Sequence, residues 1–173
     1  MLGRLASALM ALCAGAALGH DGKHGSAHSD DTPAPGQRWD FTLPTLDGSR
    51  FVQASALRGP VLVNFWGRDC APCITELPRL EAFAKANPAW TVLLVSTDAP
   101  NVAAEFVQRR GLTLTVLRPG ANVGALMRSA GNRSGGLPFT LALQTDAPGS
   151  RICERHLGEV SSEHLAQFAE RCR

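Results

Sequence analysis

The sequence lacks the features that would place it in several common classes of protein. Its 17 basic residues nearly balance 15 acidic ones, so it has no excess of positive charge for binding nucleic acid or an anionic membrane. Five cysteines among 173 residues are too few for a small domain built on disulfides. No internal repeat is present. Hydrophobic residues make up 45% of the chain, enough for the core of one domain, which excludes disorder throughout.

Residues 1–19 are predicted to be a secretory signal peptide, because Arg4 precedes a short apolar run and small residues follow. The run is shorter than the roughly 20 residues of a membrane-spanning helix. Cleavage before His20 fits the small residues best, and cleavage after Ala16 is the alternative. Cys13 would be removed with the peptide. We therefore expect a soluble periplasmic protein, in a compartment where disulfides persist.

Residues 20–37 are predicted to be a disordered linker, because they are rich in Gly, Ser, Pro and Asp and contain little that a core would bury. His20, His24 and His28 recur every four residues within it. One interpretation is a loose chelator of copper, zinc or nickel, and the other is a solvated tether. Glycines between the histidines oppose the helix that would align them, so we favour the tether.

From residue 38 to residue 173, strand and helix patterns alternate. An Asp47-Gly48 turn predicts an N-terminal β-hairpin, and the apolar run Val61–Trp66 is typical of a strand covered on both faces. Further strands are predicted at residues 90–95, 112–117, 139–143 and 151–157, and helices at 74–83, 100–111, 122–129 and after Ser161. This alternation predicts one α/β domain with parallel strand pairs.

The residues that carry chemistry are Cys70 and Cys73, in a Cys-Ala-Pro-Cys motif between the buried strand and the first helix. A thiol at a helix N-terminus is stabilised as the thiolate by the unsatisfied amides there. We expect Cys70 to be the exposed nucleophile and Cys73, one turn later, to be the resolving thiol. Pro72 would fix the turn between them.

This motif has two other interpretations. Half of a zinc site would need a second Cys-X-X-Cys pair, which Cys153 and Cys172 do not form. The second interpretation is an inert structural disulfide. The position of the motif between a strand and a helix favours redox activity instead.

Two segments carry a family resemblance: VLVNFWGRDCAPCITELP at residues 61–78 and Gly-Leu-Pro-Phe-Thr at residues 136–140. Together they resemble the thioredoxin superfamily, in particular its exported TlpA/ResA-like thiol–disulfide oxidoreductases. The resemblance covers residues 38–173. It implies a thioredoxin fold, in which helices flank a mixed central sheet, with an N-terminal β-hairpin and an extra β-α unit (residues 91–117) before a cis-proline, Pro138. It further implies that Pro138 lies beside the cysteines and that the Leu137 backbone binds an extended substrate.

Three side chains near the motif are also interpreted through this resemblance. Asn64 stands where thioredoxin has a buried Asp, and an amide cannot serve as that base. Glu76 matches a family Glu that either assists deprotonation of Cys73 or is a solvated acid favoured by the helix dipole. Trp66 either flanks the active-site surface or belongs to the core.

Cys153 and Cys172 are predicted to form a structural disulfide between the last strand and the last helix, because export makes pairing the expected state. The alternative is two separate buried thiols.

The leading functional hypothesis is an exported enzyme that reduces protein disulfides, with a membrane thiol–disulfide electron donor. Its direction and its substrates, such as apocytochrome c or copper-site assembly proteins, are implied by the resemblance alone. We expect a monomer with no cofactor, no metal and no nucleic acid. The alternatives are a copper metallochaperone-like protein and a non-catalytic thioredoxin-fold binding module. Peroxiredoxin chemistry is disfavoured because the residues before Cys70 lack that family's Pro and Thr pattern.

Overall fold

The computed structural model describes residues 36–146 and 149–172. The predicted signal peptide with Cys13, and the three histidines His20, His24 and His28, lie outside these residues. The division of the chain into signal peptide, linker and domain therefore stays a prediction. Within the described ranges, none of the helices has the length and apolar character that crossing a bilayer requires.

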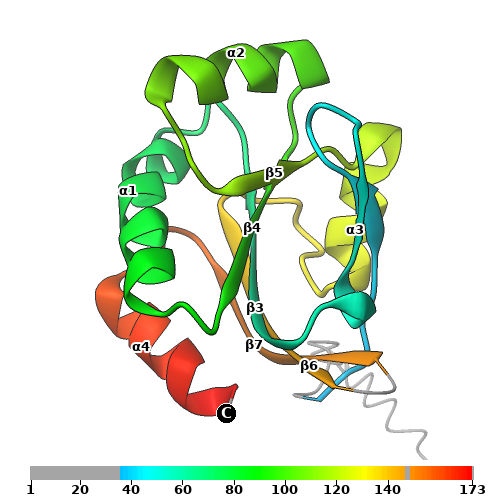
Figure 1. The fold of residues 1–173 in the computed structure, drawn as a ribbon, viewed down its shortest axis with the longest axis vertical. Helices are drawn as coiled ribbons and strands as arrows, with labels where there is room; N and C mark the ends of the chain where they lie inside the picture. Colours follow the sequence, from blue (N-terminus) through cyan, green and yellow to red (C-terminus); the bar gives the residue numbers. More distant parts are fainter. Residues whose placement is uncertain (1–35, 147–148, 173) are drawn as a thin grey trace, which may run out of the picture. The chain divides into compact units, whose positions relative to one another are not determined.

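A five-stranded mixed sheet forms the centre of the domain (Figure 1). In spatial order its strands are β5 (Thr115–Leu117), β4 (Thr91–Ser96), β3 (Gly59–Trp66), β6 (Phe139–Asp146) and β7 (Gly149–Leu157). The β3–β4 and β4–β5 pairs are parallel, whereas β3–β6 and β6–β7 are antiparallel. The central strand β3 is buried from Val61 to Trp66, as its continuous apolar run predicts.

Helices cover both faces of the sheet, and each face has its own apolar cluster. On one face, α1 (Ala71–Ala86), α2 (Pro100–Arg110) and α4 (Ser162–Arg171) contribute side chains to the core. The opposite face is covered by α3 (Val123–Ser129) and by the predicted hairpin, β1 (Thr42–Pro44) paired antiparallel with β2 (Phe51–Gln53). Two 3₁₀ turns, η1 (Ala54–Ala56) and η2 (Gly120–Asn122), complete the elements. The α/β thioredoxin-type architecture is confirmed.

The strand predicted at residues 112–117 is shorter than expected, since β5 spans only Thr115–Leu117. The backbone N–H of Leu112 donates to Val107 O and so closes the end of α2. The N–H of Thr113 donates to the Glu81 side chain of α1. Both donors are used by helices, one at the end of α2 and one at a side chain of α1, and the sheet ladder begins only after them.

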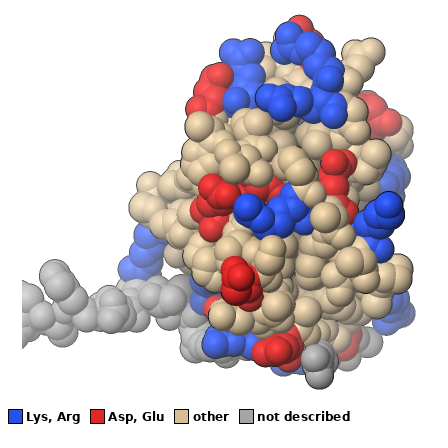
Figure 2. Space-filling model, turned by 90° about the vertical axis from the view of Figure 1, so that its left-hand side faces the viewer, with Lys and Arg blue, Asp and Glu red and all other residues tan. Residues whose placement is uncertain are grey.

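Charged groups are distributed in small clusters on the face that carries α1 and α4. Figure 2 shows clusters of charged side chains separated by uncharged surface, some with acidic and basic groups side by side, and the largest basic group at the upper end of this face. The last turn of α2, which lies at that end in Figure 1, carries Arg109 and Arg110.

The last helix is fixed at both ends. Ser161 caps α4 in a reciprocal pair of hydrogen bonds with His164, which satisfies two backbone donors. At the other end, Cys172 is 3% exposed and is joined by a disulfide to Cys153 of β7, with 5.6 Å between the Cα atoms. This bond ties the C-terminal end of α4 to the sheet.

We predict that this disulfide stabilises the fold by restricting the unfolded chain. Closing a loop of about 20 residues is worth about 3 kcal/mol in the chain-entropy model. Changing Cys153 and Cys172 to Ala in a Cys70→Ser/Cys73→Ser parent should lower the free energy of unfolding by that amount in urea titrations. Dithiothreitol should destabilise the parent similarly and leave the quadruple variant unchanged. A parent whose stability does not respond to reduction would contradict this role.

Candidate active site

The Cys-X-X-Cys motif lies at the junction between β3 and α1, as predicted. Cys70 is the N-cap of α1, and its sulfur accepts a hydrogen bond from the Cys73 backbone N–H at 3.3 Å. The two cysteines form a disulfide, with Cα atoms 5.2 Å apart. Cys70 is partly exposed, whereas Cys73 has no exposed surface. Pro72 is exposed in the first turn of α1. Its lack of a backbone N–H costs no hydrogen bond there, because the N–H groups of a first helical turn have no partner within the helix.

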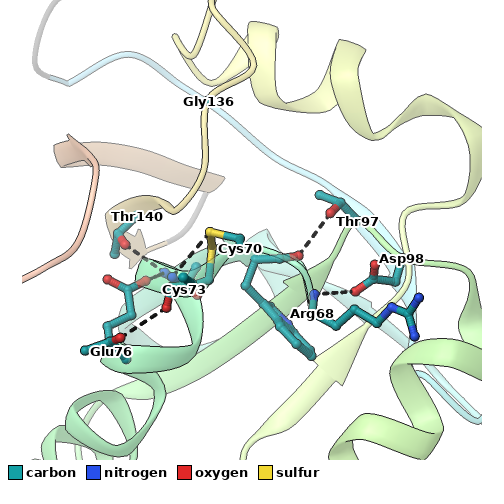
Figure 3. The surroundings of a disulfide bond; sticks show 12 residues. Arg68, Cys70, Cys73, Glu76, Thr97, Asp98, Gly136 and Thr140 are labelled. Atoms are coloured by element: carbon teal, nitrogen blue, oxygen red, sulfur yellow. Dashed lines mark hydrogen bonds between the residues drawn. A yellow bond between two sulfur atoms is a disulfide. The ribbon is translucent and has the colours of Figure 1, made fainter.

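A second segment approaches the cysteines from the loop before β6. The Leu137–Pro138 peptide bond is cis, which confirms that part of the predicted fold. Figure 3 shows the chain at Gly136 passing over the cysteine pair. Asn132, which is 3% exposed, holds this loop: its Nδ2 donates to Gly136 O at 2.8 Å, and its Oδ1 accepts from Gly135 N at 3.0 Å.

The sequence interpretation did not single out Asn132. An asparagine within a glycine-rich segment was the available signal, because such side chains often bond nearby backbone in turns.

Glu76 lies one helical turn after Cys73 and has no exposed surface. Its Oε1 accepts from Asn64 Nδ2 of β3 at 2.7 Å, and its Oε2 accepts from the backbone N–H of Val160 at 2.7 Å. Asn64 Nδ2 also donates to Thr140 Oγ1 of β6 at 2.9 Å. The interpretation of Glu76 as a solvated acid was therefore wrong: packing against β3 and the β7–α4 turn removes its carboxylate from water.

Burial raises the pKa of Glu76 from 4.5 to about 7. The hydrogen bonds from Val160 and Asn64 work in the opposite direction, since both donate to the carboxylate. Of the nearby charges, Glu159 raises the pKa further and Arg79 lowers it. Glu76 is thus a carboxyl group that can gain or lose a proton near neutral pH.

The loop between β3 and α1 is held by the loop after β4 (Figure 3). Thr97 donates from its backbone N–H and its hydroxyl to Trp66 O, and the Arg68 backbone N–H donates to Asp98 Oδ2 at 2.8 Å. A Cβ at Gly67 would lie 2.9 Å from Thr97 Oγ1, so the close approach of the two loops requires glycine there. Neither Thr97 nor Asp98 was predicted to take part.

Trp66 belongs to the core and does not flank the surface. Its side chain has no exposed area, and its ring lies 5.1 Å, centroid to centroid, from that of Phe106. Its position explains this, because Trp66 ends the buried run Val61–Trp66 of β3 and α2 covers the same face.

Among the described residues, no group of three or more His, Cys, Asp or Glu side chains is placed to hold a metal ion. Cys70 and Cys73 are bonded to each other, as are Cys153 and Cys172.

The fold and the site together define a thioredoxin-fold protein with a redox-type cysteine pair. The family model described as the AhpC/TSA family matches residues 33–130, and the chain belongs to this family. It is 36% identical over 94 residues to the soluble secreted antigen MPT53 of Mycobacterium tuberculosis, which covers 54% of each chain. The chain thus spans about half the length of that relative. It is 28% identical to the thiol-disulfide oxidoreductase ResA of Halalkalibacterium halodurans, covering 78% of this chain and 74% of ResA.

This chain is also similar to solved structures. A secreted thiol-disulfide isomerase from Corynebacterium glutamicum matches with a TM-score of 0.63 and 25% identity, covering 77% of this chain and 83% of that one. StoA from Bacillus subtilis matches with a TM-score of 0.61 and 20% identity over 78% of this chain and 99% of its own, a likeness of fold. These similarities confirm the predicted relationship to the ResA-like thiol–disulfide oxidoreductases.

We predict that Glu76 makes the stability of the oxidised protein depend on pH. Because its pKa is raised in the folded state, from 4.5 to about 7, its proton stabilises the fold fully below pH 4.5 and that contribution is lost as the pH rises through 7. The free energy of unfolding should therefore fall by up to about 3 kcal/mol between roughly pH 5 and 8.

Urea titrations across this pH range test the prediction. Glu76→Gln should remove most of the slope, and Glu105→Gln, at an exposed helix position, should keep it. Equal slopes in the wild-type protein and Glu76→Gln would show that Glu76 does not titrate in this range.

Proposed function

We propose that this protein is an exported thiol–disulfide oxidoreductase that reduces protein disulfides through Cys70 and Cys73. The observation that carries the proposal is the position of the pair at the N-terminus of α1. Cys70 is partly exposed, whereas Cys73 is buried and is followed one turn later by the buried carboxyl group of Glu76. Export is supported by the signal-peptide pattern of residues 1–19 and by relatives described as secreted.

The reaction begins with both cysteines reduced. The Cys70 thiolate attacks one sulfur of a substrate disulfide, forms a mixed disulfide and releases the other substrate sulfur as a thiolate. Deprotonated Cys73 then attacks the Cys70 sulfur, so the Cys70–Cys73 bond forms and the second substrate thiolate leaves. The substrate gains two electrons and the pair loses two. The released thiolates are protonated, and a membrane thiol–disulfide donor would return the electrons to the pair.

The structure offers different environments for the two thiols. Cys70 at the helix N-terminus is next to unsatisfied backbone N–H groups, which stabilise a thiolate. Cys73 is buried, which disfavours its thiolate, so its proton needs an acceptor. Glu76 is on the same face of α1 one turn later, and its pKa of about 7 suits a group that takes up a proton near neutral pH.

The substrate would bind beside the cis-proline. Leu137 is partly exposed and Pro138 is buried, and an extended segment that passes Cys70 would pair with the backbone at Leu137. Backbone pairing of this kind is tolerant of sequence, which is consistent with protein substrates in general. Apocytochrome c and copper-site assembly proteins are the candidates that the family resemblance supplies.

The direction of electron flow is decided by the reduction potential. A reductant should have a potential near the thioredoxin value of about −270 mV, whereas an oxidant would lie near −120 mV. Equilibration with glutathione, followed by mass spectrometry of Cys70 and Cys73, measures it.

A copper-binding role has less support. Within the described ranges, no third His, Cys, Asp or Glu side chain is placed with the cysteine pair to complete a metal site. The histidines His20, His24 and His28 lie outside those ranges.

We predict that Cys70 and Cys73 are both needed for catalysis and that replacing each of them stops the reaction at a different step. Cys70→Ser should abolish reduction of insulin by dithiothreitol, at least about 100-fold, because no nucleophile remains. Cys73→Ser should instead accumulate partners as mixed disulfides on Cys70, seen on non-reducing gels after expression in the exported compartment.

The matched control is Cys153→Ser/Cys172→Ser, which removes two cysteines of the same chain and should keep insulin reduction. Wild-type protein that does not reduce insulin would favour the non-catalytic binding module.

A further inference from the structure

The carboxylate of Glu76 depends on one backbone group that comes from a turn. Val160, in the turn between β7 and α4, has no exposed surface and donates its N–H to Glu76 Oε2 at 2.7 Å. A buried carboxylate is strongly affected by each donor that reaches it, because water cannot replace a lost hydrogen bond. Whatever fixes Val160 therefore affects the proton affinity of Glu76.

The turn is held from two sides. From α1, the Arg79 guanidinium donates to Val160 O and forms an ion pair with Glu159 at 3.2 Å. From α4, the His164 Nδ1 accepts the Ser161 backbone N–H at 3.1 Å. The peptide group that joins residues 160 and 161 is thus bonded on its carbonyl side by Arg79 and on its amide side by His164.

Arg79 is also one helical turn after Glu76 on α1, three positions along the chain. Its charge therefore acts on the carboxylate as well as on the turn. The Arg79 side chain is 33% exposed, so its guanidinium is partly solvated.

We propose that Arg79 is a positioning residue for the resolving step: it holds the Val160 N–H against the Glu76 carboxylate, so that Glu76 receives the proton of Cys73. This rests on the proposed function, in which Cys73 gives up its proton, attacks Cys70 and releases the substrate thiolate. Arg79 touches neither sulfur in that step. It acts through the Val160 peptide and through its charge.

Other charged and titratable groups lie near the turn. Glu159 of the turn raises the pKa of Glu76, and Arg79 lowers it. On β7, burial lowers the pKa of His156 from 6.5, so its ring is neutral above that pH. This ring is tilted against that of His164, with 3.9 Å between the ring centroids. Glu163 of α4 has its pKa lowered by the Ser161 side chain and stays ionised.

The resolving step can be followed with Ellman's reagent as the disulfide. The reduced protein releases thionitrobenzoate twice: first when Cys70 attacks, then when Cys73 displaces the second group from Cys70. The pH at which the second phase is half-maximal should rise by about one unit in Arg79→Ala, because Glu76 loses a placed donor and a nearby positive charge. The first phase should not change.

Two further variants separate positioning from general loosening of the turn. Arg79→Lys keeps a cation that can donate to Val160 O and should restore the wild-type midpoint. Glu159→Gln removes the opposing charge and should lower the midpoint. Simple loosening of the turn would instead shift the midpoints of Arg79→Ala and Glu159→Gln in the same direction.

Arg109→Ala, at an exposed ion pair in α2, is the matched control. If Arg79→Ala does not fold, Arg79→Gln takes its place with the same expectation.

An unchanged midpoint in a folded Arg79 variant would overturn the positioning role. A wild-type protein whose Cys70 does not react with Ellman's reagent would instead contradict the proposed function. The two failures are therefore distinguishable.

Discussion

The burial of one carboxyl group links the fold of this protein to its chemistry. Glu76 of α1 is bound by Asn64 of β3 and by the backbone of Val160 before α4. Three elements must therefore meet correctly for this group to be buried with its hydrogen bonds made. An unpaired ionised carboxylate in such a place would cost several kcal/mol, so the group instead holds its proton to a higher pH.

The same junction gives the two cysteines different environments. β3 ends in the buried interior and α1 begins at the surface, so Cys70 is at the boundary and Cys73 is one turn inside. The buried thiol and the buried carboxyl group share one face of α1. In the proposed reaction, the first step would take place in water at Cys70, and the second proton transfer would take place where solvent does not reach. The C-terminal disulfide holds the far end of α4 to β7, and the donor to Glu76 is in the turn that precedes this helix.

The sequence predicts most of the framework, because its signals are local. A continuous apolar run identifies β3, helical spacing identifies α1, and a Cys-X-X-Cys motif between them locates the site. The cis conformation of Pro138 came from the family resemblance and not from the residues themselves, since most X–Pro bonds are trans. Local reasoning failed where a residue's partner is distant. The burial of Glu76 depends on Val160, 84 positions away, and the short β5 results from bonds of Leu112 and Thr113 to helices.

The most direct test is to observe the titration of Glu76 itself. In protein labelled with ¹³C at the glutamate carboxyl carbon, NMR should show one resonance that titrates near pH 7 and is absent from Glu76→Gln. Reducing the Cys70–Cys73 bond should change this titration, because it creates a titratable thiol at Cys73, one helical turn before the carboxyl group. If every glutamate titrates near the ordinary value of about 4.3, Glu76 is ionised throughout the working range and cannot exchange the proton of Cys73 as proposed.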